Sequence, residues 1–260
     1  MNKVNILSAA ITTGSYGQLL DQLFSLARQP EAAYVCFSNV HMVIEAQRDP
    51  MFRTILNQAD MAVPDGMPVA KAVNLLHGQE QDRFAGMDIV PETFSRSEKE
   101  GLSVFFYGDT QQTLDRLCEK VTAEFPQLKI AGAISPPFRK LSEEEQQELI
   151  NQINDARPDF LMVALGCPKQ EKWMAAHKEQ LSTCMLGIGN ALRTYLGDEE
   201  RAPEWMQKAS LEWLHRLIQN PKRLWKRYLV TNSWFVGLLI LAIAKRYMGT
   251  VFVSQKLSSS

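Results

Sequence analysis

Short apolar runs, often β-branched or aromatic, alternate over the first 190 residues with longer stretches in which apolar residues recur at helical spacing. The short runs predict strands, at Val4–Leu7, Tyr34–Ser38, Met61–Val63, Val104–Tyr107, Lys129–Ile134, Phe160–Leu165 and Cys184–Ile188. The longer stretches predict amphipathic helices, at 16–28, 67–77, 88–97, 111–124, 142–156 and 169–181. This alternation is typical of an α/β fold with a mostly parallel sheet, whose ligands bind at the carboxyl ends of the strands.

After about residue 200 the pattern becomes helical only, so we expect a core at 1–200 and a helical appendage at 201–260. A basic segment with interleaved aromatic residues, 221–228, precedes the uncharged stretch Leu229–Ala244. As a helix this stretch would be about 24 Å long, whereas a bilayer core needs roughly 20 residues. We therefore expect a helix that lies in the membrane interface. A helix docked on the core, or one that forms an oligomer, is the alternative.

Charge is distributed unevenly. The net charge is −1, but residues 201–260 carry ten Lys or Arg and two Glu, which leaves −9 for residues 1–200. A basic extension on an acidic body indicates an anionic partner, either a membrane surface or nucleic acid. The four cysteines show neither CxxC pairs nor metal-ligand spacing, and they favour free thiols in a reducing cytosol. The N-terminal residues are typical of a first strand rather than of a signal peptide.

Three polar residues in loops after predicted strands are candidates for chemistry. Asn39 could hold a substrate hydroxyl or cap the following helix. Asp65, in an Asp-Gly pair, could act as a general base or serve only as a turn residue. Arg83 could clamp a phosphate or carboxylate, or remain a solvated surface side chain.

Two glycine turns are weaker candidates. Gly108-Asp109 connects a strand to a helix whose free N–H groups could bind a phosphate, but it is not a GxGxxG motif. In "LGCPKQE" Gly166 permits close backbone approach, while Pro168 and Glu171 suit the start of a helix. These roles leave Gln170 unexplained. Walker A, HExxH and GxSxG motifs are absent from the sequence.

Taken in order, these segments resemble the WecG/TagA/CpsF glycosyltransferase family (family 26). The matching pieces are Asn39, "ADMAVPDGMPV" (59–69), "RFAGMD" (83–88), "FFYGD" (105–109), "SPPF" (135–138), "ALGCPKQEKWM" (164–174), "GIG" (187–189) and "RAPEWMQKASLEWLHRLIQNPKRLWKRYL" (201–229). Each motif alone is weak, but the ordered set is specific and covers nearly the whole chain.

The resemblance implies a Rossmann-like, inverting glycosyltransferase that needs no metal or other cofactor. Its donor would be a UDP-sugar carrying N-acetylmannosamine, its uronic acid, or a related hexose or uronic acid. Its acceptor would be a polyprenyl-diphosphate-linked saccharide in bacterial surface polysaccharide synthesis. The protein would be peripheral at the cytoplasmic face of the inner membrane, held by the C-terminal helices. Nucleic acid is not an expected partner, and a homo-oligomer stays open.

The resemblance also implies roles for individual residues. Asp65 would be the catalytic base, and Asn39 would orient a sugar. Substrate-binding positions would be Arg83, Gly108, Asp109, Gly166, Lys169, Gln170, Gly187 and Arg193. The basic residues Arg216, Arg223 and Arg227 would approach the membrane and the diphosphates.

One segment departs from the family pattern. An aromatic residue and an aspartate typically follow the Gly-x-Gly, but Leu192 and Arg193 stand there, and acidic residues 198–200 replace a basic stretch. Arg193 would invert the local charge, which puts the donor in question and could favour a uronic acid. The alternatives are a non-catalytic membrane scaffold of the same fold and a nucleotide-sugar oxidoreductase or epimerase. The last needs a glycine-rich turn after the first strand, where only Gly14 is found.

Overall fold

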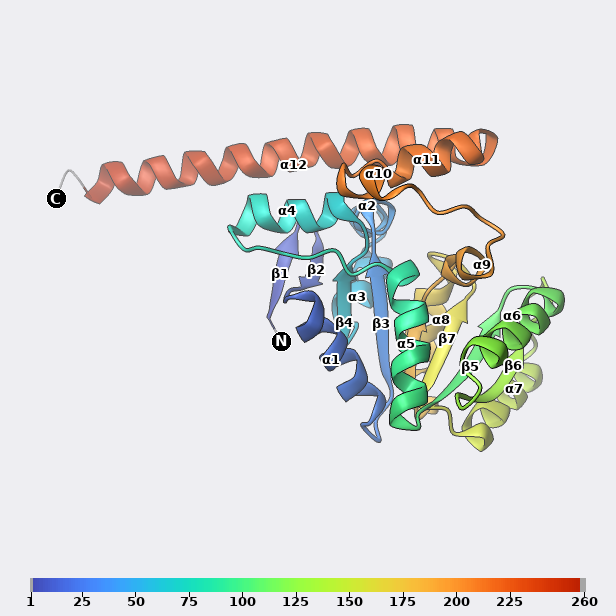
Figure 1. The fold of residues 1–260 in the computed structure, drawn as a ribbon. Coiled ribbons are helices and arrows are strands. Elements are labelled where there is room, and N and C mark those ends of the chain that lie inside the picture. The colour runs from blue at the N-terminus through green and yellow to red at the C-terminus, as the bar shows by residue number, and fades with distance from the viewer. Residues whose placement is uncertain (1, 258–260) are drawn as a thin grey trace.

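Six parallel strands form one sheet in the computed structural model, in the order β4-β3-β8-β7-β5-β6 (Figure 1). They are β3 (Ala33–Ser38), β4 (Met61–Pro64), β5 (Ser103–Gly108), β6 (Lys129–Ile134), β7 (Phe160–Ala164) and β8 (Cys184–Gly187). The structure describes residues 2–257, and the side chains of these residues other than 208, 223, 227 and 247–257. The α/β fold class predicted from the hydrophobic pattern is confirmed.

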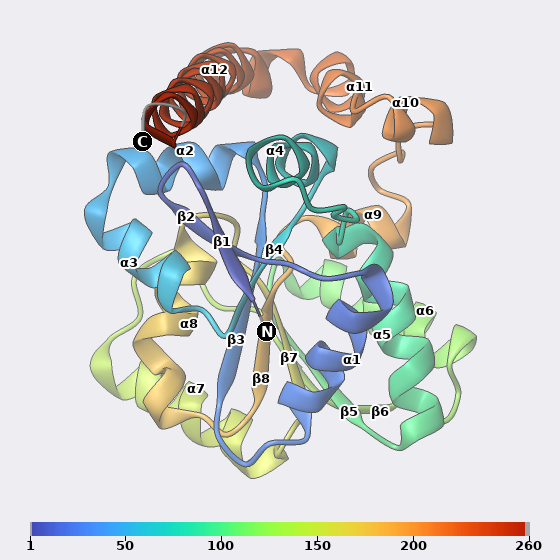
Figure 2. The same ribbon diagram turned by 90° about the vertical axis from the view of Figure 1, so that its left-hand side faces the viewer.

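Helices cover both faces of this sheet (Figure 2). One core cluster lies under α1 (Tyr16–Ala27), α5 (Gly86–Glu100), α6 (Gln111–Glu124) and α9 (Ala191–Leu196). The other lies under α2 (Val40–Arg48), α3 (Pro50–Gln58), α4 (Met67–His77), α7 (Glu143–Ala156) and α8 (Lys169–His177), which the short η1 (Lys178–Gln180) follows. Side chains of alternating strand positions enter opposite clusters, as the period of two in a strand requires.

The N-terminal segment differs from its prediction. β1 (Lys3–Ile6) pairs antiparallel with β2 (Ala9–Thr12) in a separate two-stranded sheet, and β2 was not predicted. Its four residues include two alanines, which carry little strand signal. The helices α2 and α3 were also missed, because each has nine residues and Asp49-Pro50 interrupts their common apolar period. Asp49 caps α3, accepting from the N–H groups of Met51 and Phe52.

Three further helices lie across the carboxyl end of the sheet: α10 (Glu204–Lys208), α11 (Glu212–Gln219) and α12 (Pro221–Leu257) (Figures 1 and 2). α12 packs along α2 and α4. Its buried residues include Thr231 and Phe235, and the guanidinium of Arg48 lies 4.4 Å from the centre of the Trp234 ring. The first half of α12 is therefore part of the folded protein.

α12 is longer than the 16-residue uncharged stretch that the sequence indicated. Its segment Leu224–Arg246 has 23 residues and contains an 18-residue window with a mean hydropathy of 1.5, of which 11% is buried. By length and composition alone, this segment could cross a membrane. The same segment packs on the core at its N-terminal half, which favours a helix that lies along the protein surface.

Candidate active site

A cavity of about 460 Å³ lies between the carboxyl end of the sheet and the helices α11 and α12. From the core, residues at or beyond the carboxyl ends of β3, β4, β7 and β8 line it, among them Asn39, Asp65, Gly166, Gln170 and Gly187. From the C-terminal layer come Glu212, Trp213, Arg216, Asn220, Tyr228, Thr231, Asn232 and Phe235. Arg216, also from this layer, is a predicted site residue as well. With the five named from the core, six predicted site residues line one cavity.

Asp65 follows β4 and lies at the floor of this cavity. Its backbone N–H donates to the Ser38 carbonyl at 3.0 Å. Its carboxylate accepts weakly, from the amide of Asn39 and from the N–H of Gly86, both at 3.4 Å. Gly66, the next residue, has a φ of +105°, so that the chain can turn sharply into α4.

Burial raises the pKa of Asp65, and the negative charge of Glu212 adds to this rise. The positive charge of Arg216 and the hydrogen bond from Asn39 act in the opposite direction. A carboxylate with a raised pKa is a stronger proton acceptor than an exposed aspartate, which is what a general base requires.

Asn39 fills one of the two roles that the sequence left open, the cap of the following helix, and it also contacts Asp65. Its side-chain oxygen accepts from the Met42 N–H at 3.3 Å and so caps α2. Its side-chain NH₂ group donates to Asp65. The cap fixes the side chain that contacts the carboxylate.

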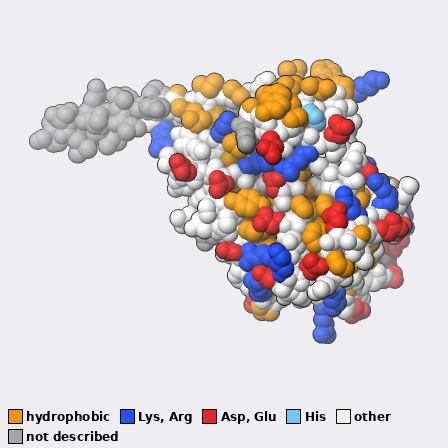
Figure 3. Space-filling view, viewed as in Figure 1, with side chains coloured by type: hydrophobic (Ala, Val, Ile, Leu, Met, Phe, Trp, Pro, Cys, Tyr) orange, Lys and Arg blue, Asp and Glu red, His pale blue; other side chains and the backbone are white. Residues whose placement is uncertain are grey.

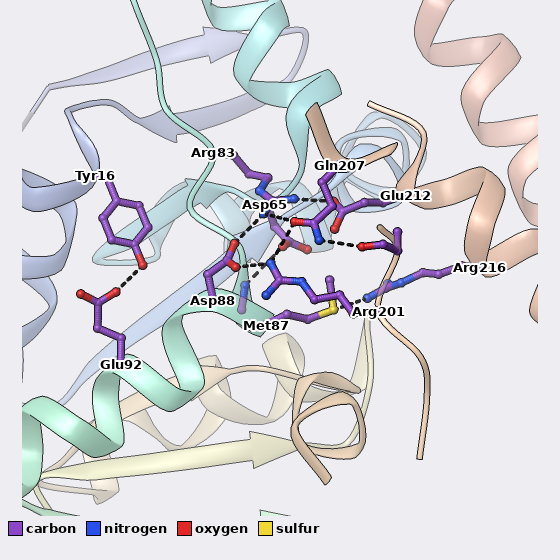
Figure 4. A network of polar contacts seen from close by, with 12 residues as sticks. Tyr16, Asp65, Arg83, Met87, Asp88, Glu92, Arg201, Gln207, Glu212 and Arg216 are labelled. Atoms are coloured by element: carbon purple, nitrogen blue, oxygen red, sulfur yellow. Dashed lines mark hydrogen bonds and ion pairs between the residues drawn. The ribbon is translucent and has the colours of Figure 1, made fainter. Parts of the chain in front are cut away.

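Arg83 binds carboxylates rather than facing the cavity directly. Its guanidinium donates to Asp88 and to Glu212, each at 2.7 Å, and to Gln207 at 3.1 Å (Figure 4). Arg201 contacts Asp88 and Gln207 as well. These contacts form a polar network that joins the core to α10 and α11.

Gln170 has a structural partner at each end of its amide. Its oxygen accepts from the Gly166 N–H at 3.0 Å, and its nitrogen donates to the Gly187 carbonyl at 2.7 Å. The side chain therefore joins the turn after β7 to the end of β8 and shapes the cavity floor. A Cβ on Gly187 would lie 2.7 Å from the Met174 methyl group and 3.1 Å from the Gln170 amide nitrogen, so a side chain there would displace these groups.

Glu171 is more than the helix-start residue that the sequence suggested. It lies in the first turn of α8, but its side chain is fully buried and accepts from Gln170 at 2.8 Å. Burial raises the pKa of Glu171 to about 7. It is therefore a buried titratable group immediately behind the cavity wall.

Besides Arg83, four predicted binding residues are not among the described residues that line the cavity: Gly108, Asp109, Lys169 and Arg193. Arg193 makes two hydrogen bonds to the Asp109 carboxylate, at 2.7 and 2.6 Å. Asp109 therefore offsets the charge of Arg193, which the sequence alone suggested would invert the local charge. A Cβ on Gly108 would lie 2.6 Å from the backbone of Ala164, which explains the glycine by packing.

Arg216 lines the cavity from α11, and its guanidinium donates to the Met87 sulfur at 3.2 Å. Arg223 and Arg227 lie in the first turns of α12, and their side chains are outside the described part of the structure. Several lining residues were not proposed from the sequence, including His41, Glu199 and Glu212. The sequence did contain a signal for Glu212, because this residue opens the Glu-Trp-x-x-Arg-Leu motif, of which only the arginine was considered.

The sequence of this chain is similar to those of known proteins over most of its length. The model of the "Glycosyl transferase WecG/TagA/CpsF family" matches residues 4–249. An "N-acetylglucosaminyldiphosphoundecaprenol N-acetyl-beta-D-mannosaminyltransferase" of Bacillus subtilis (strain 168) is 31% identical over 81% of this chain and 80% of its own. The protein of that name from Staphylococcus aureus (strain MW2) is 26% identical over 94% of each chain. Together with the cavity at the strand ends, the match over nearly the whole chain shows that this protein belongs to the WecG/TagA/CpsF glycosyltransferase family.

Proposed function

We propose that this protein is an inverting glycosyltransferase that moves N-acetylmannosamine, its uronic acid or a related sugar from a UDP donor to a polyprenyl-diphosphate-linked saccharide. The relatives named above act on N-acetylglucosaminyl-diphosphoundecaprenol. The observation that carries the proposal is Asp65, a carboxylate with a raised pKa that faces a cavity at the carboxyl end of a parallel sheet. A family match and a suitably placed base together favour catalysis over a scaffolding role.

In the proposed reaction Asp65 accepts the proton of an acceptor hydroxyl. The hydroxyl oxygen forms a bond to the anomeric carbon while the bond from that carbon to the diphosphate oxygen breaks. UDP leaves with the electron pair of the broken bond, and the single displacement inverts the anomeric configuration. Asn39, fixed by its capping contact, holds the carboxylate and a sugar hydroxyl in line for this step.

The leaving diphosphate needs positive charge or N–H donors. Among the described side chains that line the cavity, Arg216 is the only Arg or Lys. Arg223 and Arg227 extend the basic segment on the next helix. We therefore assign the diphosphate to this side of the cavity and expect no metal to be required. Arg83, which binds two carboxylates in this structure, would reach a phosphate only by exchanging one of them.

A lipid-linked acceptor requires contact with a membrane. The layer formed by α10 to α12 carries exposed apolar residues, Trp205, Ile218, Trp225, Leu229, Val230, Ile240 and Leu241. Figure 3 shows apolar side chains gathered along this side of the molecule. Aromatic and aliphatic groups beside Lys and Arg are typical of a helix that lies in the interface of an anionic membrane. This supports peripheral attachment at the cytoplasmic face, with the cavity held at the membrane surface.

The donor class is tested by titration calorimetry of the purified full chain with UDP and, separately, with NAD. We expect UDP to bind and NAD not to bind. We expect Arg216→Ala to weaken UDP binding by about tenfold or more, since one charge-assisted contact contributes roughly 1.5–3 kcal/mol. Binding of NAD without binding of UDP would support the oxidoreductase alternative and reject this proposal.

A further inference from the structure

Glu212 is a second carboxylate in the cavity of Asp65, and it comes from the C-terminal layer. It opens α11, and its side chain is 17% exposed. One oxygen, Oε2, accepts from Arg83 at 2.7 Å. The other, Oε1, is buried and has no hydrogen-bond partner among the described residues. Figure 4 shows Glu212 next to Asp65 and Arg83.

Arg83 is the connection between this helix and the core. Its guanidinium, 13% exposed, holds Glu212 on one side and Asp88 on the other. Asp88 belongs to the first turn of α5 and is not among the described residues that line the cavity. The two carboxylates thus share one cation at equal distances, but only Glu212 contributes charge to the cavity.

Charged groups on several neighbouring elements affect the proton affinity of the Asp65 carboxylate. The charge of Glu212 favours its protonated form, and the charge of Arg216, also on α11, favours the ionised form. Arg83 lies close enough to interact with it as well. The remaining titratable groups among the described residues that line the cavity are His41, Cys167, Glu199 and Tyr228. Like charges in a partly dehydrated site raise each other's proton affinity.

We propose that Glu212 is a positioning residue for the transfer reaction: it fixes Arg83 at the junction of core and α11, and it places a second negative charge beside Asp65. The base is then complete only when α11 is docked on the core. This inference rests on the proposed role of Asp65 as the base. Both charged residues of the Glu-Trp-x-x-Arg-Leu motif then act on Asp65. From the same helix, Glu212 raises the pKa of Asp65 and Arg216 lowers it.

The test compares Glu212→Gln with Asp88→Asn in the full chain. Each variant removes one negative charge from Arg83 and keeps an oxygen that can accept its hydrogen bond. The readout is the midpoint of the acidic limb of kcat against pH, where Asp65 must lose its proton. Glu212→Gln should move this midpoint to lower pH by roughly 0.5 units or more, because a like charge has been removed. Asp88→Asn should leave it within error of the wild type.

An equal shift in the two variants, or no shift in Glu212→Gln, overturns the inference and leaves Glu212 as a structural partner of Arg83. If Glu212→Gln is too slow for a pH profile, carbon NMR gives the titration midpoint of the Asp65 carboxyl directly, assigned by the signal missing from Asp65→Asn. An unshifted midpoint there has the same meaning. An Asp65→Asn variant that keeps its rate overturns the base itself, and so identifies a failure of the proposed function rather than of Glu212 alone.

Discussion

Replacing Asp65 by Asn is expected to lower kcat by about 10²–10⁴-fold, the range usual for loss of a general base. The amide keeps the size of the carboxylate and can still contact Asn39 and the Gly86 N–H group, but it cannot take the acceptor's proton. Initial rates of UDP release with a lipid-linked acceptor measure the effect. Because the base must be ionised, the wild-type rate should rise with pH through the raised pKa of Asp65.

Asp60 provides a matched control at the other end of the same strand. Its carboxylate pairs with Lys178 at 2.8 Å and is not among the described cavity residues. Asp60→Asn should therefore keep kcat near the wild-type value, and both variants should bind UDP as the wild type does. Equal rates for Asp65→Asn and the wild type would reject Asp65 as the base.

Removal of residues 201–260 is expected to lower transfer by about 100-fold or more, while the sheet core stays folded. The deletion takes away one side of the cavity, including Glu212, Trp213, Arg216 and Tyr228. Misplaced or missing binding groups of this kind cost about two orders of magnitude in rate. Circular dichroism would check the fold of the truncated chain, and turnover of a short-chain, water-soluble acceptor would measure its activity without a membrane.

A variant of the outer side of α12 separates the cavity from the membrane surface. Ile240 and Leu241 are 60% and 59% exposed and are not among the described cavity residues. Changing both to Glu should weaken binding to anionic vesicles but preserve turnover of the soluble acceptor. A truncated chain that turns over the soluble acceptor at the wild-type rate would show that the C-terminal helices serve the membrane alone.

The sequence predicted the sheet well because buried parallel strands are short apolar runs with clear ends. All six strands of the large sheet were predicted, and the residues after them were correctly expected at one edge. Asn39, Asp65, Gly166, Gln170 and Gly187 do meet there. The segments it missed, β2, α2, α3 and α9, are short and carry no period long enough to recognise.

The sequence could not predict which side chains pair across the fold, because these partners lie far apart along the chain. Arg83 and Glu212 are 129 positions apart, and their ion pair depends on how α11 docks. Arg193 was expected to invert the local charge, but Asp109, 84 positions earlier, pairs with it. Gln170 was expected among the substrate-binding residues; it lines the cavity, and its amide also joins two strand ends. In each case the local motif drew attention to the residue, and only the packing showed its partners.

The central claim is that this chain joins a sugar from a UDP donor to a polyprenyl-diphosphate-linked saccharide in the cavity around Asp65. Mass spectrometry of the lipid product tests it most directly, with the full chain, an N-acetylglucosamine-diphosphate lipid, and UDP-N-acetylhexosamines and UDP-hexuronic acids offered one at a time. We predict that at least one donor extends the lipid by a single sugar residue with release of UDP, and that Asp65→Asn forms little of this product. An unextended lipid with every donor, in protein shown to be folded and to bind UDP, would contradict the account.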